Sequence, residues 1–261
     1  MTIAPLFYRE YGNAAPDARP LLLLHGLFGS SSNWHGIARR LADRYWTLVP
    51  DLRNHGLSPW SAQMSYEAIA GDIAALMDDL GIRQASVVGH SMGGKAAMWL
   101  ALTQADRIGR LIVADIAPVR YQSRFAKILN GLNALPLEGL TTRELADSRL
   151  AAAVPEQAIR NYLLQNLVRD GGTWRWRVNL PVIGASISRI MDFPIAAGRQ
   201  YPAPTLFVYG TASDYVGGAQ LATIKDLFPL ARLRAIPNAG HWVYADQPDA
   251  FVAAVGGFLA S

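Results

Sequence analysis

Cysteine is absent from this sequence of 261 residues. Its absence excludes disulfide bonds, thiol nucleophiles and thiolate metal sites, and is compatible with any redox compartment. Clustered charge is also lacking, because the net charge is only +4 and no basic run is longer than Arg39-Arg40. A nucleic-acid-binding surface requires clustered basic residues. We therefore expect no nucleic-acid partner.

Long apolar runs are missing too. No span of about 18 apolar residues is present that could cross a membrane. The segment Met1–Pro5 shows neither the basic region nor the apolar core of a secretory signal. We expect no membrane span and take the cytoplasm as the default location. The composition, 51% hydrophobic and 17% charged, is that of a globular protein, and the length suits one α/β core with an insertion.

The stretch Gly89-His90-Ser91-Met92-Gly93 has the G-x-S-x-G pattern of a nucleophile elbow. Such an elbow is a sharp turn that lifts a serine oxygen clear of a sheet and leaves no room for a Cβ atom two residues to either side. The motif alone is weak, since roughly 0.1 chance matches are expected in a chain of this length. Its context supports it, because Ala85–Val88 reads as a short buried strand and Gly93–Leu102 as a buried helix.

Short apolar strands alternate with amphipathic helices along most of the chain. This alternation predicts a doubly wound, mostly parallel α/β sheet with helices on both faces, and ligands bound beyond the carboxyl ends of the strands. The sequence predicts an edge strand at Leu6–Tyr11, a turn through Gly12-Asn13 and Pro16-Asp17, and buried strands at Leu21–Leu24, Trp46–Val49, Ala85–Val88, Leu111–Ala114, Thr205–Tyr209 and Leu233–Ile236. It also predicts a helix that begins after Ser65 and ends at Gly81, a helix through Leu221 and Leu227, and a closing helix over Pro248–Leu259.

Between Val119 and Gly198 helical spacing replaces buried strands. The expected features are one helix face with Phe125, Ile128, Leu129 and Leu132, another with Ile159, Tyr162, Leu163 and Leu167, and a capping box of Thr141 with Glu144. Trp174–Val178 alternates like a strand, and we favour a half-buried element with solvated arginines over an anion site. We expect residues 119–198 to form a helical cap on a core of residues 1–118 and 199–261.

A serine hydroxyl needs a base within hydrogen-bond reach, and the base needs an acid to orient it. Of the five histidines, only His241 follows both the serine and the candidate acids, which gives the chain order Ser, Asp, His. His25, His55 and His90 belong to turns whose geometry they can fix. Asp51 and His55 lie four apart in one loop upstream of the serine, so we favour a structural network for them.

A glycine-rich turn, His25–Ser30, follows the second strand and points backbone N–H groups outward. Two such groups are what an acyl-transfer oxyanion requires. The alternative is a tight loop without a chemical role.

Together these motifs resemble the α/β-hydrolase superfamily. His25–Ser30, Asp51–Ser58, Gly89–Lys95, Ala114–Val119 and Ala239–Trp242 are most similar to small bacterial esterases of the YbfF type and their mitochondrial relatives, and the match extends to Trp176–Asn179 in the cap. The resemblance implies a serine esterase or thioesterase without a cofactor or metal, acting on small or activated acyl esters. Composition and motif spacing alone indicate only that the reaction is an acyl transfer.

The resemblance also bears on the acid. Relatives of this type match the chain at Asp115 and usually lack a carboxylate at Asp214, whereas the wider superfamily places its acid after the later strand, where this chain has Ser213. We favour Asp115 as the acid, keep Asp214 as the alternative, and treat Ser213 as a second partner of His241.

The hypothetical mechanism is attack by Ser91 with His241 as base, Asp115 as acid, and the N–H groups of Leu27 and Met92 as the oxyanion hole. Phe28 and His90 are expected at the acyl pocket, and acyl chains up to about six carbons are expected to be preferred. The alternatives are a cofactor-free perhydrolase, a carbon–carbon bond hydrolase, and a non-catalytic small-molecule receptor. The oligomeric state stays open.

Overall fold

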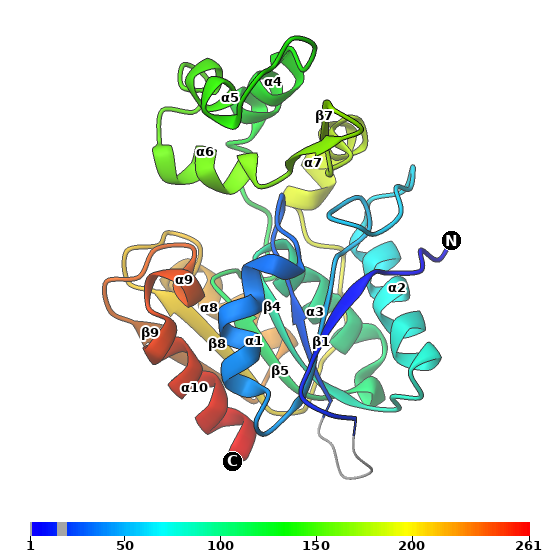
Figure 1. The fold of residues 1–261 in the computed structure, drawn as a ribbon. Coiled ribbons are helices and arrows are strands. Elements are labelled where there is room, and N and C mark those ends of the chain that lie inside the picture. The colour runs from blue at the N-terminus through cyan, green and yellow to red at the C-terminus, as the bar shows by residue number, and fades with distance from the viewer. Residues whose placement is uncertain (1, 15–19) are drawn as a thin grey trace.

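The computed structural model describes residues 2–14 and 20–261, and within them seven strands form one sheet in the order β1-β3-β2-β4-β5-β8-β9 (Figure 1). β1 (Tyr8–Tyr11) runs antiparallel to β3 (Trp46–Pro50) at the edge, and the other neighbours are parallel. The other strands are β2 (Pro20–Leu24), β4 (Ala85–His90), β5 (Ile108–Ala114), β8 (Thr205–Gly210) and β9 (Ala231–Ile236). The predicted mostly parallel sheet is confirmed.

The sheet is buried on both faces, and the four leucines of β2 show how. Successive side chains of a strand point to opposite faces. Leu21 and Leu23 accordingly belong to one apolar cluster, and Leu22 and Leu24 to another. Burial on both faces explains why the strands read as uninterrupted apolar runs in the sequence.

Helices cover each face. The cluster of Leu21 and Leu23 includes residues of α1 (His35–Leu41), α9 (Val243–Asp246) and α10 (Pro248–Ala260). The opposite cluster includes residues of α2 (Tyr66–Asp79), α3 (Met92–Thr103) and α8 (Leu221–Leu227). The Ser65 side chain accepts a hydrogen bond from the backbone N–H of Ala68 and so caps α2, as its sequence predicts.

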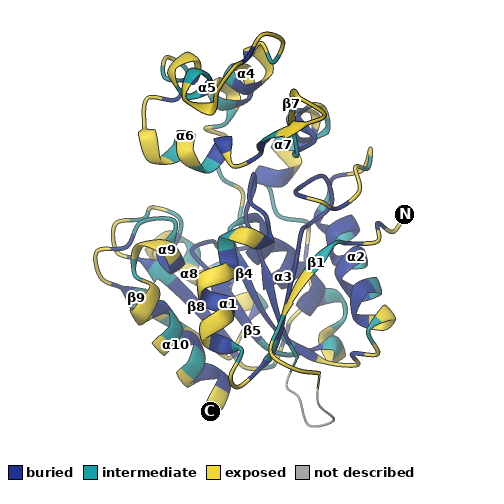
Figure 2. Ribbon diagram, viewed as in Figure 1, coloured by how far each residue is buried: buried dark blue, intermediate teal, exposed yellow. Residues whose placement is uncertain are grey.

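Between β5 and β8 the chain leaves the sheet and forms a separate layer above one of its edges (Figure 1). This segment contains α4 (Ala126–Ala134), α5 (Arg143–Leu150), α6 (Gln157–Leu164), a hairpin of β6 (Leu167–Asp170) and β7 (Thr173–Trp176), and α7 (Leu180–Met191). Figure 2 shows that α5 and α6 expose much of their outer surface, whereas the central strands of the large sheet, such as β4, are mostly buried.

Two details of this segment differ from the sequence prediction. Leu167 does not continue the helix face of Ile159, because α6 ends at Leu164 and the Asn166 side chain bonds the carbonyl of Leu163 at 3.2 Å. The cap of α5 is Thr142, whose hydroxyl accepts from the backbone of Leu145. A capping box requires Glu or Gln three residues after the cap, so the predicted Thr141 box is wrong.

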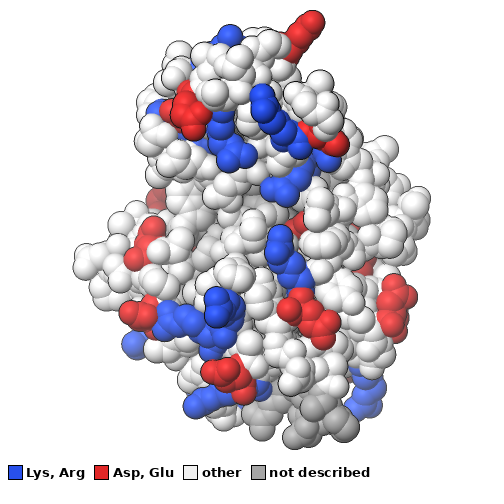
Figure 3. Space-filling view, viewed as in Figure 1, with Lys and Arg blue, Asp and Glu red and all other residues white. Residues whose placement is uncertain are grey.

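The predicted turn at Pro16-Asp17 lies outside the described residues, whereas Gly12 takes a φ of +77° as a turn glycine can. None of the helices within residues 2–14 and 20–261 is long and apolar enough to cross a membrane. On the face drawn in Figure 3 acidic and basic side chains are interspersed.

Candidate active site

Ser91 occupies a strained turn between β4 and α3. Its φ of 51° and ψ of −117° lie in a region that side-chain-bearing residues seldom adopt. A Cβ atom on Gly89 would come within 3.0 Å of backbone atoms of Gly93, and one on Gly93 within 3.0 Å of the Leu24 backbone. The turn therefore requires glycine at both positions, as a nucleophile elbow does.

Asp115 and His241 meet at the same edge of the sheet. Asp115 follows β5 and is fully buried, and its Oδ2 accepts a hydrogen bond from Nδ1 of His241 at 2.7 Å. The same oxygen accepts from the Ser213 hydroxyl, and Oδ1 accepts from the backbone N–H of Gly210 at 3.0 Å. Donors on three sides fix the orientation of this carboxylate.

Asp214 lies apart from this pair. Its side chain is 62% exposed and forms an ion pair of 2.6 Å with Arg124, which holds the pKa of Asp214 below its usual range. Ser213 differs from expectation as well, because its hydroxyl bonds Asp115 and not His241. The reason is geometric: Ser213 follows β8, the strand beside β5, and so faces the carboxylate.

His241 is held at one face of its ring and at its backbone carbonyl. Tyr215 stacks on the ring with centroids 4.0 Å apart and an interplanar angle of 20°. His90 donates from Nε2 to the His241 carbonyl oxygen at 2.8 Å. Burial keeps the pKa of His90 well below its ordinary value, so the ring is neutral, with its proton on Nε2.

Ser91 and His241 line one cavity of about 260 Å³ together with Phe28 and His90. The hydrogen bonds of His241 within the described residues are those to Asp115 and His90, so its ring is not bonded to the Ser91 hydroxyl. Catalytic hydrogen bonds of this kind are often long before a substrate binds.

The predicted oxyanion groups lie on the two turns beside Ser91. Met92 is the first residue of α3, so its N–H has no acceptor within the helix. The turn that carries Leu27 is held from two directions. Tyr162 of α6 donates to the Leu27 carbonyl at 3.0 Å, and Asn166 donates to the Phe28 carbonyl at 2.7 Å.

The loop of Asp51 and His55 forms the expected structural network. Asp51 accepts from the backbone of Ser31 at 2.5 Å and of Leu57 at 2.8 Å. His55 accepts at Nε2 from the Phe28 N–H, at 3.2 Å, and burial lowers the pKa of His55 to about 3. A permanently neutral His55 thus supports the turn next to Leu27.

The model of the alpha/beta hydrolase family matches residues 21–254. The chain belongs to this family. The sn-1-specific diacylglycerol lipase ABHD11 of Mus musculus is 42% identical over 92% of this chain and 80% of the relative. Esterase YbfF of Escherichia coli strain K12 is 38% identical over 92% of each chain. The solved structure of a marine microorganism esterase is 36% identical, with a TM-score of 0.93 over 98% of this chain and 99% of that one.

A second, much smaller cavity of this alpha/beta hydrolase adjoins Ser91, and His241 does not line it. Its volume is about 20 Å³, and its lining includes Met92, Tyr121 and Ile190. Leu27, Ser91, Phe125 and Tyr215 line both cavities, so the two cavities adjoin at Ser91.

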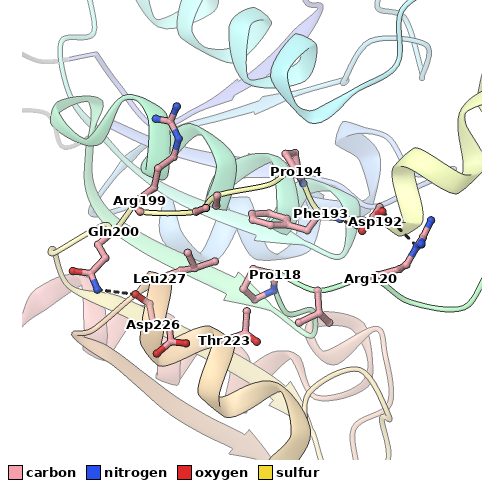
Figure 4. A pocket seen from close by; sticks show the side chains of 14 residues that line it. Pro118, Arg120, Asp192, Phe193, Pro194, Arg199, Gln200, Thr223, Asp226 and Leu227 are labelled. Carbon is pink, nitrogen blue, oxygen red and sulfur yellow. Dashed lines mark hydrogen bonds and ion pairs between the residues drawn. The ribbon is translucent and has the colours of Figure 1, made fainter.

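A wider cavity of about 640 Å³ lies on the flank of the hydrolase, where the inserted segment joins the sheet domain. Figure 4 shows Pro118, Arg120 and Asp192 on one side of it and Gln200 and Asp226 on the other. Neither Ser91 nor His241 lines this cavity, so it does not belong to the candidate site.

The sequence analysis missed the role of Lys95 in this hydrolase. Lys95 is buried, and its Nζ donates to the carbonyl oxygens of Val119, Met191 and Asp192 at 2.8–2.9 Å. These acceptors lie at the two ends of the inserted segment. The only sequence signal is that Lys95 lies two residues after the elbow motif, and a lysine is ordinarily expected at the surface.

Proposed function

We propose that this protein is a serine esterase that hydrolyses short-chain or activated carboxylic esters or thioesters through an acyl-enzyme. The observation that carries the proposal is the hydrogen-bonded pair of buried Asp115 and His241, which lines the same cavity as Ser91 on its strained turn. The names esterase and lipase among relatives that match most of the chain support it.

In this mechanism His241 takes the proton of Ser91 as the serine oxygen bonds the acyl carbon. The negative carbonyl oxygen accepts hydrogen bonds from the N–H groups of Leu27 and Met92. The ester bond then breaks, and the alcohol leaves with the proton of His241. Water next adds to the acyl-enzyme by the same path in reverse. Asp115 holds the Nδ1–H tautomer and stabilises the imidazolium.

The base and the oxyanion donors are expected to contribute large factors to the rate. General acid–base catalysis by His241 supplies about 10² to 10⁴ in rate, and each oxyanion donor roughly 10² to 10³. Both depend on positioning, because a donor must lie near the place where the oxyanion forms. The bonds from Tyr162 and Asn166 to the Leu27 turn support such positioning.

We also propose that residues 119–198 act as a cap over a core of residues 1–118 and 199–261. Cap residues Phe125, Ile128, Ile159 and Leu163 line the 260 Å³ cavity. Closure by these apolar side chains would exclude water from the ester and strengthen the electrostatic interactions within the site.

The test is covalent labelling by a fluorophosphonate together with turnover of p-nitrophenyl acetate. Ser91→Ala is expected to abolish labelling and to lower kcat by about 10⁵ to 10⁶, whereas Ser148→Ala on α5 serves as a matched serine control and keeps both. A wild-type protein that is neither labelled nor active on any activated ester would instead support a non-catalytic receptor.

A further inference from the structure

The two cavities that meet at Ser91 differ more than tenfold in volume, about 260 Å³ against about 20 Å³. An ester has two arms, one on the acyl carbon and one on the leaving oxygen. If each cavity receives one arm, their sizes decide which esters fit. This inference rests on the proposed function of Ser91 as the nucleophile.

His241 decides which arm enters which cavity. The leaving oxygen must receive a proton from His241, so the alcohol lies on the His241 side of Ser91. His241 lines the large cavity and not the small one, Met92 lines the small one and not the large one, and Leu27 and Ser91 line both. With the alcohol on the His241 side of Ser91, the small cavity beside Met92 is left for the acyl arm.

The small cavity leaves little room for an acyl chain. Its volume of about 20 Å³ is less than a tenth of the 260 Å³ of the large cavity, so it accepts a much shorter group. Part of its wall is buried, since Met92, Ile116 and Ile190 are all at most 5% exposed. Added methylenes would have to displace a packed interior, and overpacking is costly.

The polar atoms around the small cavity are already bonded to the protein. Tyr66 donates to the Ile190 carbonyl at 2.5 Å, and Tyr121 donates to the Tyr215 carbonyl at 2.6 Å. Lys95 donates its three hydrogen bonds to carbonyl oxygens at the two ends of the cap. A carboxylate on the acyl group would therefore lose its hydration without gaining a donor.

The large cavity is also apolar but offers much more room. Phe28, Ile128, Ile159, Leu163 and Trp242 give it apolar walls, and Arg124 lies among its lining residues. It suits an extended or cyclic apolar alcohol.

We infer that the preferred substrates are acetate esters of bulky apolar alcohols, and that Ile190 at the end of α7 limits the length of the acyl group. The range of up to about six acyl carbons expected from the sequence narrows to two or three. Ile159, on α6, bounds the alcohol instead.

The sharpest test compares two isomers of equal composition, hexyl acetate and ethyl hexanoate, with the full-length wild-type protein. Hexyl acetate should have the higher kcat/KM by roughly 10- to 200-fold, the range that mismatched methylenes produce in a closed pocket. Equal values, or a preference for ethyl hexanoate, would overturn the inference. Labelling of Ser91 and turnover of p-nitrophenyl acetate report on the esterase proposal separately.

A matched pair of isoleucine variants tests the residue assignment. For Ile190→Ala the ratio of kcat/KM for hexyl acetate to that for hexyl butanoate should fall at least about tenfold. Ile159→Ala removes the same atoms from the large cavity and should leave this ratio within about threefold. Ile190→Val should shift the ratio in the same direction, and it replaces Ile190→Ala in this test if Ile190→Ala does not fold. An unchanged ratio in a folded Ile190 variant, or an equal shift in Ile159→Ala, would contradict the assignment.

Discussion

Replacing Asp115 by Asn should cripple the enzyme, and the structure explains how. The Gly210 N–H and the Ser213 hydroxyl donate to the two carboxylate oxygens. An asparagine has one acceptor oxygen, and facing it toward Gly210 turns the amide NH₂ toward His241. That NH₂ donates to Nδ1, which stabilises the tautomer with its proton on Nε2. Such a ring cannot accept the proton of Ser91.

The expected loss in kcat for Asp115→Asn approaches about 10⁴, which corresponds to about 5.4 kcal/mol of transition-state stabilisation. Asp214→Asn removes only the ion pair with Arg124, whose partners are 62% and 75% exposed. Exposed pairs of this kind contribute about 0–1 kcal/mol. The Asp214 variant should therefore lose no more than roughly tenfold.

The assay is kcat for both variants on p-nitrophenyl acetate, with circular dichroism to confirm that each is folded. Asp214→Asn is the matched control, because it makes the same chemical change in the same part of the site. The opposite ranking would transfer the role of the acid to Asp214 and refute the argument from the 2.7 Å contact between Asp115 and His241.

Three further outcomes are expected. His90→Phe removes the donor to the His241 carbonyl and should lower kcat roughly 5- to 150-fold with little change in KM. His90→Gln keeps a donor and should lower kcat less. Equal losses of kcat in the two variants would contradict this role of His90. Burial lowers the pKa of Lys95 to about 7, against about 10.4 in an unfolded chain. Between about pH 7 and about pH 10.4 the unfolded state therefore binds more protons than the folded state. The free energy of unfolding rises with pH over this interval. Thermal melts of the wild type and Lys95→Met should therefore diverge from pH 7 to 10 in favour of the wild type, and a constant difference would refute the shift. Finally, Ser91→Gly should be more stable than Ser91→Ala by about 1 kcal/mol in urea denaturation, because glycine relieves the strain at a φ of 51° and alanine does not. Equal midpoints of urea unfolding in the two variants would count against backbone strain at Ser91.

The fold and the positions of Ser91, Asp115 and His241 could be predicted because each depends on local pattern. All three follow a strand, and the carboxyl ends of parallel strands meet at one edge. The glycines around Ser91 mark its turn in the sequence itself. Local rules were therefore sufficient to bring candidates to the same edge of the sheet, although not to choose between Asp115 and Asp214.

The contacts that join the cap to the site could not be predicted in this way. Tyr162 and Leu27 are separated by 135 residues, and Asn166 and Phe28 by 138. Helical spacing puts Tyr162 on an apolar face but does not indicate which residue of the sheet domain it contacts. The same holds for Tyr215, which stacks on His241, and for the small cavity, whose volume depends on how side chains from several elements pack.

Asp115 shows how a strained residue can still be placed with precision. Its φ of 50° turns the chain out of the sheet directly after β5, at a cost of order 1–3 kcal/mol for a residue with a side chain. Its N–H bonds the Val208 carbonyl at 2.8 Å, and its carboxylate accepts from Gly210, so β8 holds both the backbone and the side chain. The position of the acid is therefore determined by the pairing of β5 with β8 and not by a loop. A carboxylate that is oriented by the sheet in advance need not reorganise when the charge on His241 develops, which is the condition for strong electrostatic stabilisation.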